Sequence, residues 1–427
     1  MTMATASPAI GFAADPAIPQ RDRLLDPDSV ADQLSRISHH DSTIESCRLR
    51  RVKYRIGESL RVVYDVVADG RNFVMSARTF DNSAEVFRAA ELDATRVLGM
   101  PGVAHDPRTD TVWWTMPNDR KLRNLGTLLD PPARVRRSSG VAWDQSQLVE
   151  YAPERSATVR LLDPHGQITG YAKAYRDRDA LDVTNQYNRI AASIALLDGI
   201  RTPRALGWAR PDRIIVLEPM RGRPWTQLPA EVQPAAMLQL GAALANVHGL
   251  PTDFGRGPFQ RYRSERVRNS ADLVAIARPD VADAVHAIRD QLADEPPAPN
   301  SIVCLHGDVH ANNVLFHGDQ VHLIDFDQGG SGAAAADIGS MMGTLLTTQL
   351  LHPDTALEGL GAAFLDGYST VRALPTSAEL QWYTAAALIA ERAIRAVNRV
   401  NQPVLAVLPE LLEMADAVLA GKLSADA

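Results

Sequence analysis

The stretch His306-Gly-Asp308-Val-His310-Ala-Asn-Asn313 combines polar side chains at a spacing suited to metal and proton chemistry. A second polar stretch, Ile324-Asp325-Phe-Asp327, follows a short turn later. Asp308 can accept a proton, while Asn313 and Asp325 offer the hard oxygen ligands that Mg²⁺ prefers. Mg²⁺ takes its other ligands from water and from a bound phosphate, so a few protein oxygens suffice. The two stretches therefore predict a site for phosphoryl transfer from ATP.

The residues around these stretches predict two short strands joined by a tight turn. Residues 301–305 form an apolar run with β-branched side chains, which is typical of a buried strand leading into the loop. Residues 314–324 contain two further apolar runs, separated by a His-Gly-Asp-Gln sequence that has the composition of a hairpin turn. The hairpin would bring Asn313 and Asp325 to one end, with Asp308 on the loop before it.

The ordered pattern His-Gly-Asp-x-His-x-x-Asn, followed by Asp-Phe-Asp, resembles the aminoglycoside phosphotransferase and choline kinase superfamily. The resemblance implies a small-molecule kinase with a bilobal, protein-kinase-like α+β fold: an antiparallel-sheet N-lobe and a mostly helical C-lobe. It implies that Asp308 is the catalytic base, and that Asn313 and Asp325 are the Mg²⁺ ligands. His306 would brace the loop, and Asp327 would serve a second metal or the loop structure.

Three further residues match positions of the resembling family. Asp337, in the stretch Gly-Ala-Ala-Ala-Ala-Asp-Ile-Gly, matches an aspartate at the start of the next helix. We interpret it as an N-cap that accepts backbone N–H bonds. His248 is interpreted as a packed structural histidine, and His310 matches a family position without an assigned role.

Three alternating runs upstream predict the antiparallel sheet of a nucleotide-binding N-lobe, at residues 147–151, 157–162 and 168–175. Lys173 in the third run matches the lysine that kinases place on the phosphates of ATP. Residues 213–218 form another buried-strand run. The resemblance places the adenine of ATP against backbone groups around Glu218 and Met220.

Two features depart from the protein-kinase pattern. The turn at residues 152–156 has no glycine, so phosphate cover would come from ordinary backbone N–H groups or a side chain. The helix predicted at residues 180–199 has no Glu to orient Lys173, and Gln186 or Asn188 are the remaining polar candidates. The missing Glu keeps an alternative open: a catalytically silent, nucleotide-binding pseudokinase with a regulatory or scaffolding role.

An internal similarity predicts a duplicated N-lobe module. Residues 52–64 resemble residues 149–161 without a gap, and Arg78 takes the position that Lys173 has in the second copy. The first copy has no catalytic loop of its own. We therefore expect a structural or regulatory cap and not a second nucleotide site.

These features predict five segments: a disordered tail at 1–25, an N-terminal α+β cap module at 26–130, a linker at 131–145, the kinase N-lobe at 146–220 and a helical C-lobe with catalytic loop and acceptor site at 221–427. The resemblance implies that the last helices line the acceptor pocket. There Glu391 or Asp366 could bind an amine. Arg395 and Arg399 could bind hydroxyls or an acid, and all four could equally be surface ion-pair partners.

Bulk properties limit the other classes of function. The 427-residue chain has a formal net charge of −7, which argues against a nucleic-acid surface. The two cysteines allow no disulfide framework, no apolar run reaches membrane-spanning length, and residues 1–20 do not have the regions of a signal peptide. We therefore expect a cytoplasmic enzyme that uses ATP and Mg²⁺ and acts on a small-molecule hydroxyl. Sugars and amino sugars are the leading acceptors, followed by aminoglycoside-like antibiotics.

Overall fold

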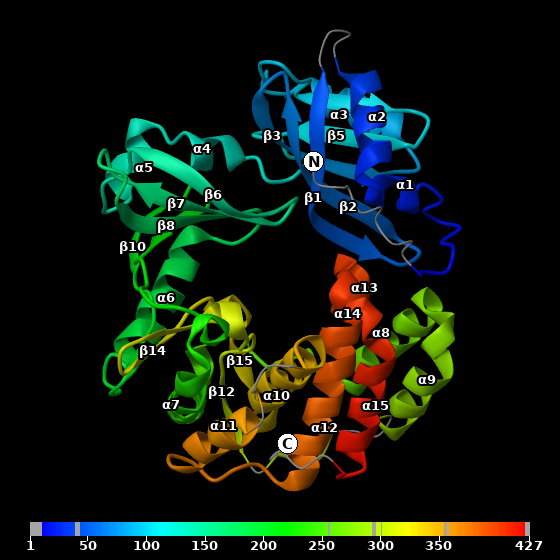
Figure 1. Ribbon diagram of the computed structural model, residues 1–427. Helices are drawn as coiled ribbons and strands as arrows, with labels where there is room; N and C mark the ends of the chain where they lie inside the picture. Colours follow the sequence, from blue (N-terminus) through cyan, green and yellow to red (C-terminus); the bar gives the residue numbers. More distant parts are fainter. Residues whose placement is uncertain are drawn as a thin grey trace. The chain divides into compact units, whose positions relative to one another are not determined.

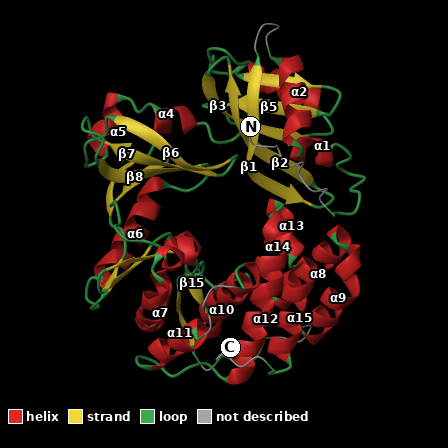
Figure 2. Cartoon of the chain, viewed as in Figure 1, coloured by secondary structure: helices red, strands yellow, loops and turns green. Residues whose placement is uncertain are grey.

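The computed structural model describes residues 11–38, 43–254, 257–292, 296–299, 301–353, 357 and 359–422. The chain divides into two compact units. Unit 1 comprises residues 1–184, 205–218 and 398–400, and unit 2 comprises residues 185–204, 219–397 and 401–427. Two antiparallel sheets make up most of unit 1, whereas helices dominate unit 2 (Figures 1 and 2). The predicted α+β fold class is confirmed.

The two sheets of unit 1 have corresponding strand orders. The first runs β1-β2-β3-β5-β4, with β1 (Ile44–Arg55), β2 (Ser59–Ala68), β3 (Arg71–Thr79), β4 (Val103–Asp106) and β5 (Thr111–Thr115). The second runs β6-β7-β8-β11-β10, with β6 (Gln145–Ala152), β7 (Ser156–Leu162), β8 (Ile168–Tyr175), β10 (Ala205–Ala209) and β11 (Ile214–Leu217). Matching strand order is what a duplicated module requires, and the duplication itself stays a prediction.

Short helices cover the sheets of unit 1. Helix α1 (Arg21–Leu25) leads into α2 (Pro27–Ile37), which packs on β1, and α3 (Ser83–Glu91) packs on β4 and β5. Helix α4 (Leu125–Leu129) packs on β6, and α5 (Ala133–Ser138) packs on β10. The sheets share one core, since Val63 of β2 belongs to the same buried cluster as Leu128 of α4 and Val159 of β7.

Residues 11–25 pack against the first sheet. The buried Asp15 side chain accepts a hydrogen bond from the Tyr54 hydroxyl at 2.7 Å and from the Gly57 N–H at 2.9 Å. The guanidinium of Arg21 lies over the Tyr54 ring, 5.4 Å from its centroid. The prediction of a disordered tail at 1–25 is therefore wrong for residues 11–25, because polar contacts to distant residues fix them. Residues 1–10 lie outside the described residues.

Unit 2 is built from helices around two small sheets. Its helices are the second part of α6 (Ala180–Ile194), α7 (Gln233–Val247), α8 (Ser264–Ala277), α9 (Ala282–Gln291), α10 (Ala334–Leu351), α11 (Leu360–Ser369), α12 (Ser377–Ala387), a π-helical turn (Leu388–Ala393), most of α13 (Ile394–Arg399), α14 (Gln402–Ala406) and α15 (Leu408–Leu419). Strand β12 (Ile302–Leu305) pairs with β15 (Gly330–Ala333). The predicted hairpin is β13 (Val314–His317) with β14 (Gln320–Leu323), and β14 also pairs with β9 (Ile200–Arg201).

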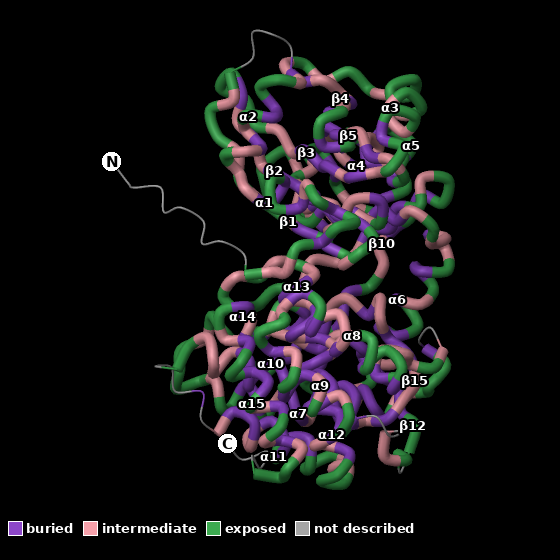
Figure 3. The backbone as a smooth tube through the Cα atoms, turned by 90° about the vertical axis from the view of Figure 1, so that its right-hand side faces the viewer, coloured by how far each residue is buried: buried purple, intermediate pink, exposed green. Residues whose placement is uncertain are grey.

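The hairpin packs against the helices of unit 2 through a shared buried core. Leu240 and Leu244 of α7, Phe316 of β13 and Ile338 of α10 belong to one buried cluster. Figure 3 shows the buried residues concentrated along the helices of this unit. No helix in the described part of the chain is both long and apolar enough to cross a membrane.

The turn between β6 and β7 is held by ion pairs within unit 1. Glu154 has a left-handed backbone conformation, with φ of 62°, and only 4% of it is exposed. Its carboxylate lies 2.7 Å from Arg78, 2.9 Å from Arg120 and 3.4 Å from Arg61. Its N–H donates to Asp119 at 2.9 Å. All four partners lie in residues 61–120, so the first part of unit 1 fixes the turn that has no glycine.

We expect Glu154→Gln to destabilise unit 1 in a pH-dependent way. Burial would raise the pKa of Glu154, but the arginines lower it from 4.5 to about 2. Such a group stabilises the fold above pH 4.5, by roughly 3 kcal/mol, and this contribution is lost as the pH falls from 4.5 towards 2. Urea unfolding should therefore show a large difference between wild type and variant at pH 7 that shrinks over this range.

The exposed Glu58, which pairs with Arg55 at 3.3 Å, provides the control. Glu58→Gln should change the urea midpoint little at any of these pH values, because exposed ion pairs contribute little. A Glu154→Gln variant that behaves like Glu58→Gln would show that the arginine cluster does not stabilise unit 1.

Candidate active site

A buried carboxylate on α10 fixes the candidate catalytic loop. The Asp337 side chain is 1% exposed, and its oxygens accept the N–H of His306 at 2.7 Å and the N–H of Gly307 at 2.9 Å. The Nε2 atom of His248, at the end of α7, lies 3.3 Å from the same carboxylate. The prediction that Asp337 caps its own helix is wrong, since α10 has no side-chain N-cap and the carboxylate binds the loop instead.

Gly307 is required by both its backbone and its surroundings. Its φ of 80° lies in the left-handed region. A Cβ atom at this position would lie 2.3 Å from the carbonyl oxygen of Gln328. The loop can therefore approach the segment after Asp325 only because residue 307 has no side chain.

His306 joins the loop to the segment that carries Asp325. Its fully buried ring donates from Nε2 to the carbonyl of Ile324 at 3.0 Å and lies 4.3 Å from the Phe326 ring. Burial lowers the pKa of His306, although neighbouring carboxylates oppose this. The neutral ring can then accept the Asp308 N–H at Nδ1, over 3.4 Å. His306 thus has the bracing position that the sequence predicted.

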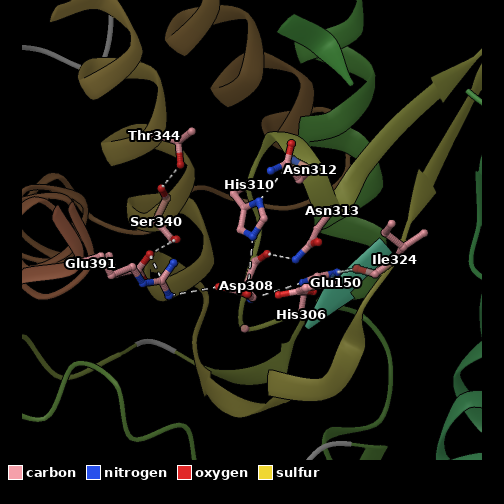
Figure 4. A network of polar contacts seen from close by, with 12 residues as sticks. Glu150, His306, Asp308, His310, Asn312, Asn313, Ile324, Ser340, Thr344 and Glu391 are labelled. Carbon is pink, nitrogen blue, oxygen red and sulfur yellow. Dashed lines mark hydrogen bonds and ion pairs between the residues drawn. The ribbon is translucent and has the colours of Figure 1, made fainter. Parts of the chain in front are cut away.

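The Asp308 carboxylate lies beside the ring of His310 (Figure 4), and two arginines also contact it. Its Oδ1 atom lies 3.4 Å from Arg261 and 3.3 Å from Arg395, and its Oδ2 atom lies 3.6 Å from Nε2 of His310. Burial favours the neutral acid. The hydrogen bond from His310 and the charges of Arg261 and Arg395 outweigh it and hold the pKa of Asp308 far below its usual value. Asp308 is therefore in the protonation state that a proton acceptor needs.

The predicted metal ligands lie next to each other at the end of the hairpin. The Ile324 N–H donates to the carbonyl of Asn313 at 3.0 Å, and Asp325 follows with a left-handed φ of 65°. The side-chain nitrogen of Asn313 donates to the carbonyl of Asp308 at 3.0 Å. This bond orients the amide, and the oxygen of the amide is the atom that would bind a metal ion. One amide and one carboxylate oxygen fit Mg²⁺, which completes its shell with water and phosphate.

Asp327 contacts α6, the helix that follows β8. Within unit 2, the hydroxyl of Tyr187 on α6 lies 3.4 Å from its Oδ1 atom. The Tyr187 side chain is buried, so this contact favours the loop-structure role for Asp327. The amide candidates Gln186 and Asn188 lie on the same part of α6, in unit 2.

The predicted acceptor residues separate into two groups. Glu391 is buried and lies 2.8 Å from Arg261, and Arg395 contacts Asp308. Asp366 is exposed on α11, and the described residues show no contact between it and this cluster. Arg399 falls in the short segment assigned to unit 1. The structure therefore brings two of the four candidates to Asp308, and it uses Glu391 as an ion-pair partner.

Lys173 lies in a cross-strand row with a carboxylate that the sequence analysis missed. Lys173 of β8 pairs with Thr158 of β7, which pairs with Glu150 of β6, so the three side chains share one face of the sheet. Burial raises the pKa of Glu150, but a 2.6 Å hydrogen bond from Arg51 and the charge of Lys173 bring it below its usual value. The kinase pattern places such an acid on the following helix, whereas the strand register places Glu150 in the row of Lys173.

The predicted adenine-binding residues flank the division between the units. Glu218 directly follows β11 in unit 1, and Met220 belongs to unit 2. The sequence predicts the link between the two lobes at these residues. Consistent with this, a segment of unit 1 ends at Glu218 and a segment of unit 2 begins at Pro219.

The model of the phosphotransferase enzyme family, APH, matches residues 143–409, which is more than half of the chain. The chain belongs to this family. The match begins at the second sheet of unit 1 and includes Lys173, Asp308, Asn313 and Asp325. The N-terminal module lies before it. No curated protein sequence matches the chain.

Solved structures of this type are similar to the chain over about two thirds of its length. The macrolide 2'-phosphotransferase MphH from Brachybacterium faecium is 17% identical, with a TM-score of 0.42, and the match covers 69% of this chain and 97% of MphH. The aminoglycoside phosphotransferase APH(4)-Ia is 14% identical, with a TM-score of 0.48 and coverages of 66% and 96%. A choline/ethanolamine kinase family protein from Mesorhizobium loti is 14% identical, with a TM-score of 0.45 and coverages of 69% and 92%.

We expect Asp337→Asn to destabilise unit 2 of this phosphotransferase-family chain. An amide accepts through only one of its two polar atoms, so one of the N–H groups of His306 and Gly307 would lose its acceptor. A lost bond to a charged acceptor in the interior costs roughly 2 kcal/mol or more. Hydrogen exchange at residues 306–307 and urea unfolding should both report the change. Asp290→Asn, on the exposed end of α9, is the control, and an equal effect there would refute the bracing role.

Proposed function

We propose that this protein transfers the γ-phosphate of ATP to a hydroxyl group of a small molecule in the presence of Mg²⁺. Membership of the phosphotransferase family supports the class of reaction. The observation that carries the proposal is the Asp308 carboxylate on its braced loop, in contact with Arg261 and Arg395 and beside the oriented amide of Asn313. Sugars and amino sugars are the first acceptors to test, and aminoglycoside-like antibiotics are the second.

On the acceptor side, Asp308 would receive a hydrogen bond from the attacking hydroxyl and take its proton. The same contact would aim an oxygen lone pair at the γ-phosphorus. Asn313 and Asp325 would hold Mg²⁺, which when bound neutralises charge on the phosphates. His306 and the buried Asp337 would keep the loop in place, since two of its N–H groups are bonded to Asp337.

On the nucleotide side, Lys173 would bind the phosphates, and backbone groups around Glu218 and Met220 would bind adenine. Glu150 would orient the lysine from the sheet, in place of the helix Glu of protein kinases. This removes the main ground for a silent nucleotide-binding protein, because a carboxylate does share the face of the sheet with Lys173. We therefore do not propose the pseudokinase role.

We expect Asp308→Asn to lower kcat by about 100- to 10,000-fold, because the proton acceptor is removed while its size is kept. ATP binding should change only a few-fold. The measurement is acceptor-dependent ADP release with pooled sugars, amino sugars, aminoglycosides and amino alcohols. Asp319→Asn, in the turn between β13 and β14, should retain full activity. Unchanged turnover in Asp308→Asn would exclude Asp308 as the base, and ATP binding without turnover in wild type would instead indicate the pseudokinase.

We expect Lys173→Met to weaken ATP binding by about tenfold or more, since a phosphate-binding charge is lost. Glu150→Gln should weaken it less, because the lysine remains but loses its carboxylate neighbour. Lys121→Met removes an exposed lysine of the same unit and should have no effect. Fluorescent ATP analogues would measure all three variants. If Glu150→Gln weakened acceptor binding and left ATP binding intact, its proposed role towards Lys173 would be wrong.

A further inference from the structure

The ion-pair cluster that contains Asp308 has more arginines than carboxylates. Arg261, from the segment before α8, and Arg395, from α13, both place an Nη2 atom within 3.4 Å of its carboxylate. A third guanidinium, that of Arg392, lies beside Glu391 at 2.9 Å. Three arginines therefore face two carboxylates in this cluster. An acceptor hydroxyl that reaches Asp308 must bring the rest of its molecule close to these cations.

The carboxylate oxygens of Glu391 accept hydrogen bonds from other side chains of the protein. Its carboxylate is fully buried and receives Arg261 at 2.8 Å, Arg392 at 2.9 Å and the Ser340 hydroxyl at 2.9 Å, and the Tyr262 hydroxyl also donates to it (Figure 4). Both oxygens are thus engaged by donors within the fold. An ammonium group of an acceptor would compete with these donors for Glu391, which is the buried member of the two acids predicted for an amine site.

A π-helical turn produces this arrangement. Residues Leu388–Ala393 form the turn between α12 and α13, and Glu391 and Arg392 lie within it. The wider turn shifts the phase of the following helix, and Arg395 comes to Asp308 while staying 4.0 Å from Glu391. Single π-turns inside α-helices are frequent at functional sites, because they cost stability and are kept for what they position.

Arg395 keeps donors for a ligand. A guanidinium has five N–H donors, and the contacts of Arg395 within the described part of the chain use its Nη2 atom alone. Its side chain is 27% exposed, whereas that of Glu391 is not exposed at all. Arg261 donates from Nη1 to Glu391 and from Nη2 to Asp308. Arg395 is therefore the most exposed of the three guanidinium groups, and it contacts Asp308 through one of its nitrogen atoms.

We infer that the acceptor carries an oxyanion, a carboxylate or a phosphate, near the hydroxyl that is phosphorylated, and that Arg395 binds it with support from Arg261. The inference rests on the proposed function and names the substrate class of the same site. Guanidinium groups bind carboxylate and phosphate through paired hydrogen bonds. A polycationic acceptor would instead place like charges beside Arg261 and Arg395, with Glu391 unable to compensate.

The transfer step then needs no further reactant. The acceptor oxyanion takes the donors that Arg395 does not use on Asp308, and the attacking hydroxyl donates a hydrogen bond to the Asp308 carboxylate. The hydroxyl oxygen forms a bond to the γ-phosphorus, and the bond from that phosphorus to the bridging oxygen of ADP breaks. The hydroxyl proton passes to Asp308 and from there to solvent, and the phosphorylated acceptor and ADP leave.

The test compares acceptors that differ only in charge. Glucose, glucuronate, a glucose monophosphate and glucosamine form one set, and glycerol, glycerate, glycerol phosphate and serinol form a second. ADP release and the mass of the product are measured with wild type. We expect an anionic member to exceed its neutral parent in kcat/KM by about tenfold, and the amine to fall below it. The better of carboxylate and phosphate identifies the oxyanion. A neutral or amine acceptor as the best member of both sets would overturn the inference.

Variants of Arg395 separate acceptor binding from phosphoryl transfer. Arg395→Gln should raise KM for the anionic acceptor by about tenfold and leave KM for ATP unchanged, and Arg395→Lys should restore part of the affinity. The exposed Arg268 of α8, changed to Gln, is the matched control. An equal fall of kcat with every acceptor would assign Arg395 to the transferred phosphoryl group and overturn the inference.

A binding measurement keeps the two proposals distinguishable. If no acceptor releases ADP, the proposed function fails, and calorimetric titration of glucuronate in the presence of Mg²⁺ and a non-hydrolysable ATP analogue decides the inference alone. Binding to wild type that is lost in Arg395→Gln would support an oxyanion site. Absence of binding, or equal binding to wild type and variant, would overturn it.

Discussion

The active-site loop depends on one buried charge, the carboxylate of Asp337. A carboxylate with 1% of its surface exposed is stable only when its charge is compensated, and here two backbone N–H groups and a histidine ring do this. The N–H groups belong to His306 and Gly307, so the bond that keeps the charge buried also sets the course of the loop. The direction of Asp308 follows from that course, and so does the bond that orients the amide of Asn313.

Two other buried carboxylates, those of Glu154 and Glu391, are likewise compensated by several donors. Glu154 gathers three arginines of the N-terminal module at the turn between β6 and β7, and Glu391 gathers arginines around Asp308. In each case a buried acid holds cations that would otherwise repel one another. Without the acid, several guanidinium groups would lie close together with uncompensated charge. Replacing either acid is therefore expected to destabilise the fold around it. The two sheets of unit 1 are thereby joined by these ion pairs as well as by a shared core.

Under the proposed function, the carboxylate partner of Lys173 comes from the sheet and not from the following helix. A phosphate-binding lysine needs a carboxylate near it to keep its charge and direction. Adjacent strands lie about 4.8 Å apart, so residues two strands apart in one row are within reach of long side chains. Glu150 and Lys173 are such a pair, and Arg51 of the N-terminal module holds Glu150 at 2.6 Å. On helix α6, the side chain of Tyr187 contacts Asp327.

The sequence by itself determined what depends on neighbouring residues: the hairpin, the loop with Asp308 and Asn313, the strands before Lys173 and the membership of a phosphotransferase family. Alternation and turn composition are local, so a short window reveals them. Tertiary structure alone decided the roles of Asp337, Glu150 and Glu391 and the packing of residues 11–25. Their partners are distant in the chain, since Arg51 is 99 residues from Glu150 and Arg261 is 130 residues from Glu391. An ion pair needs only proximity in space, and no spacing in the sequence encodes it.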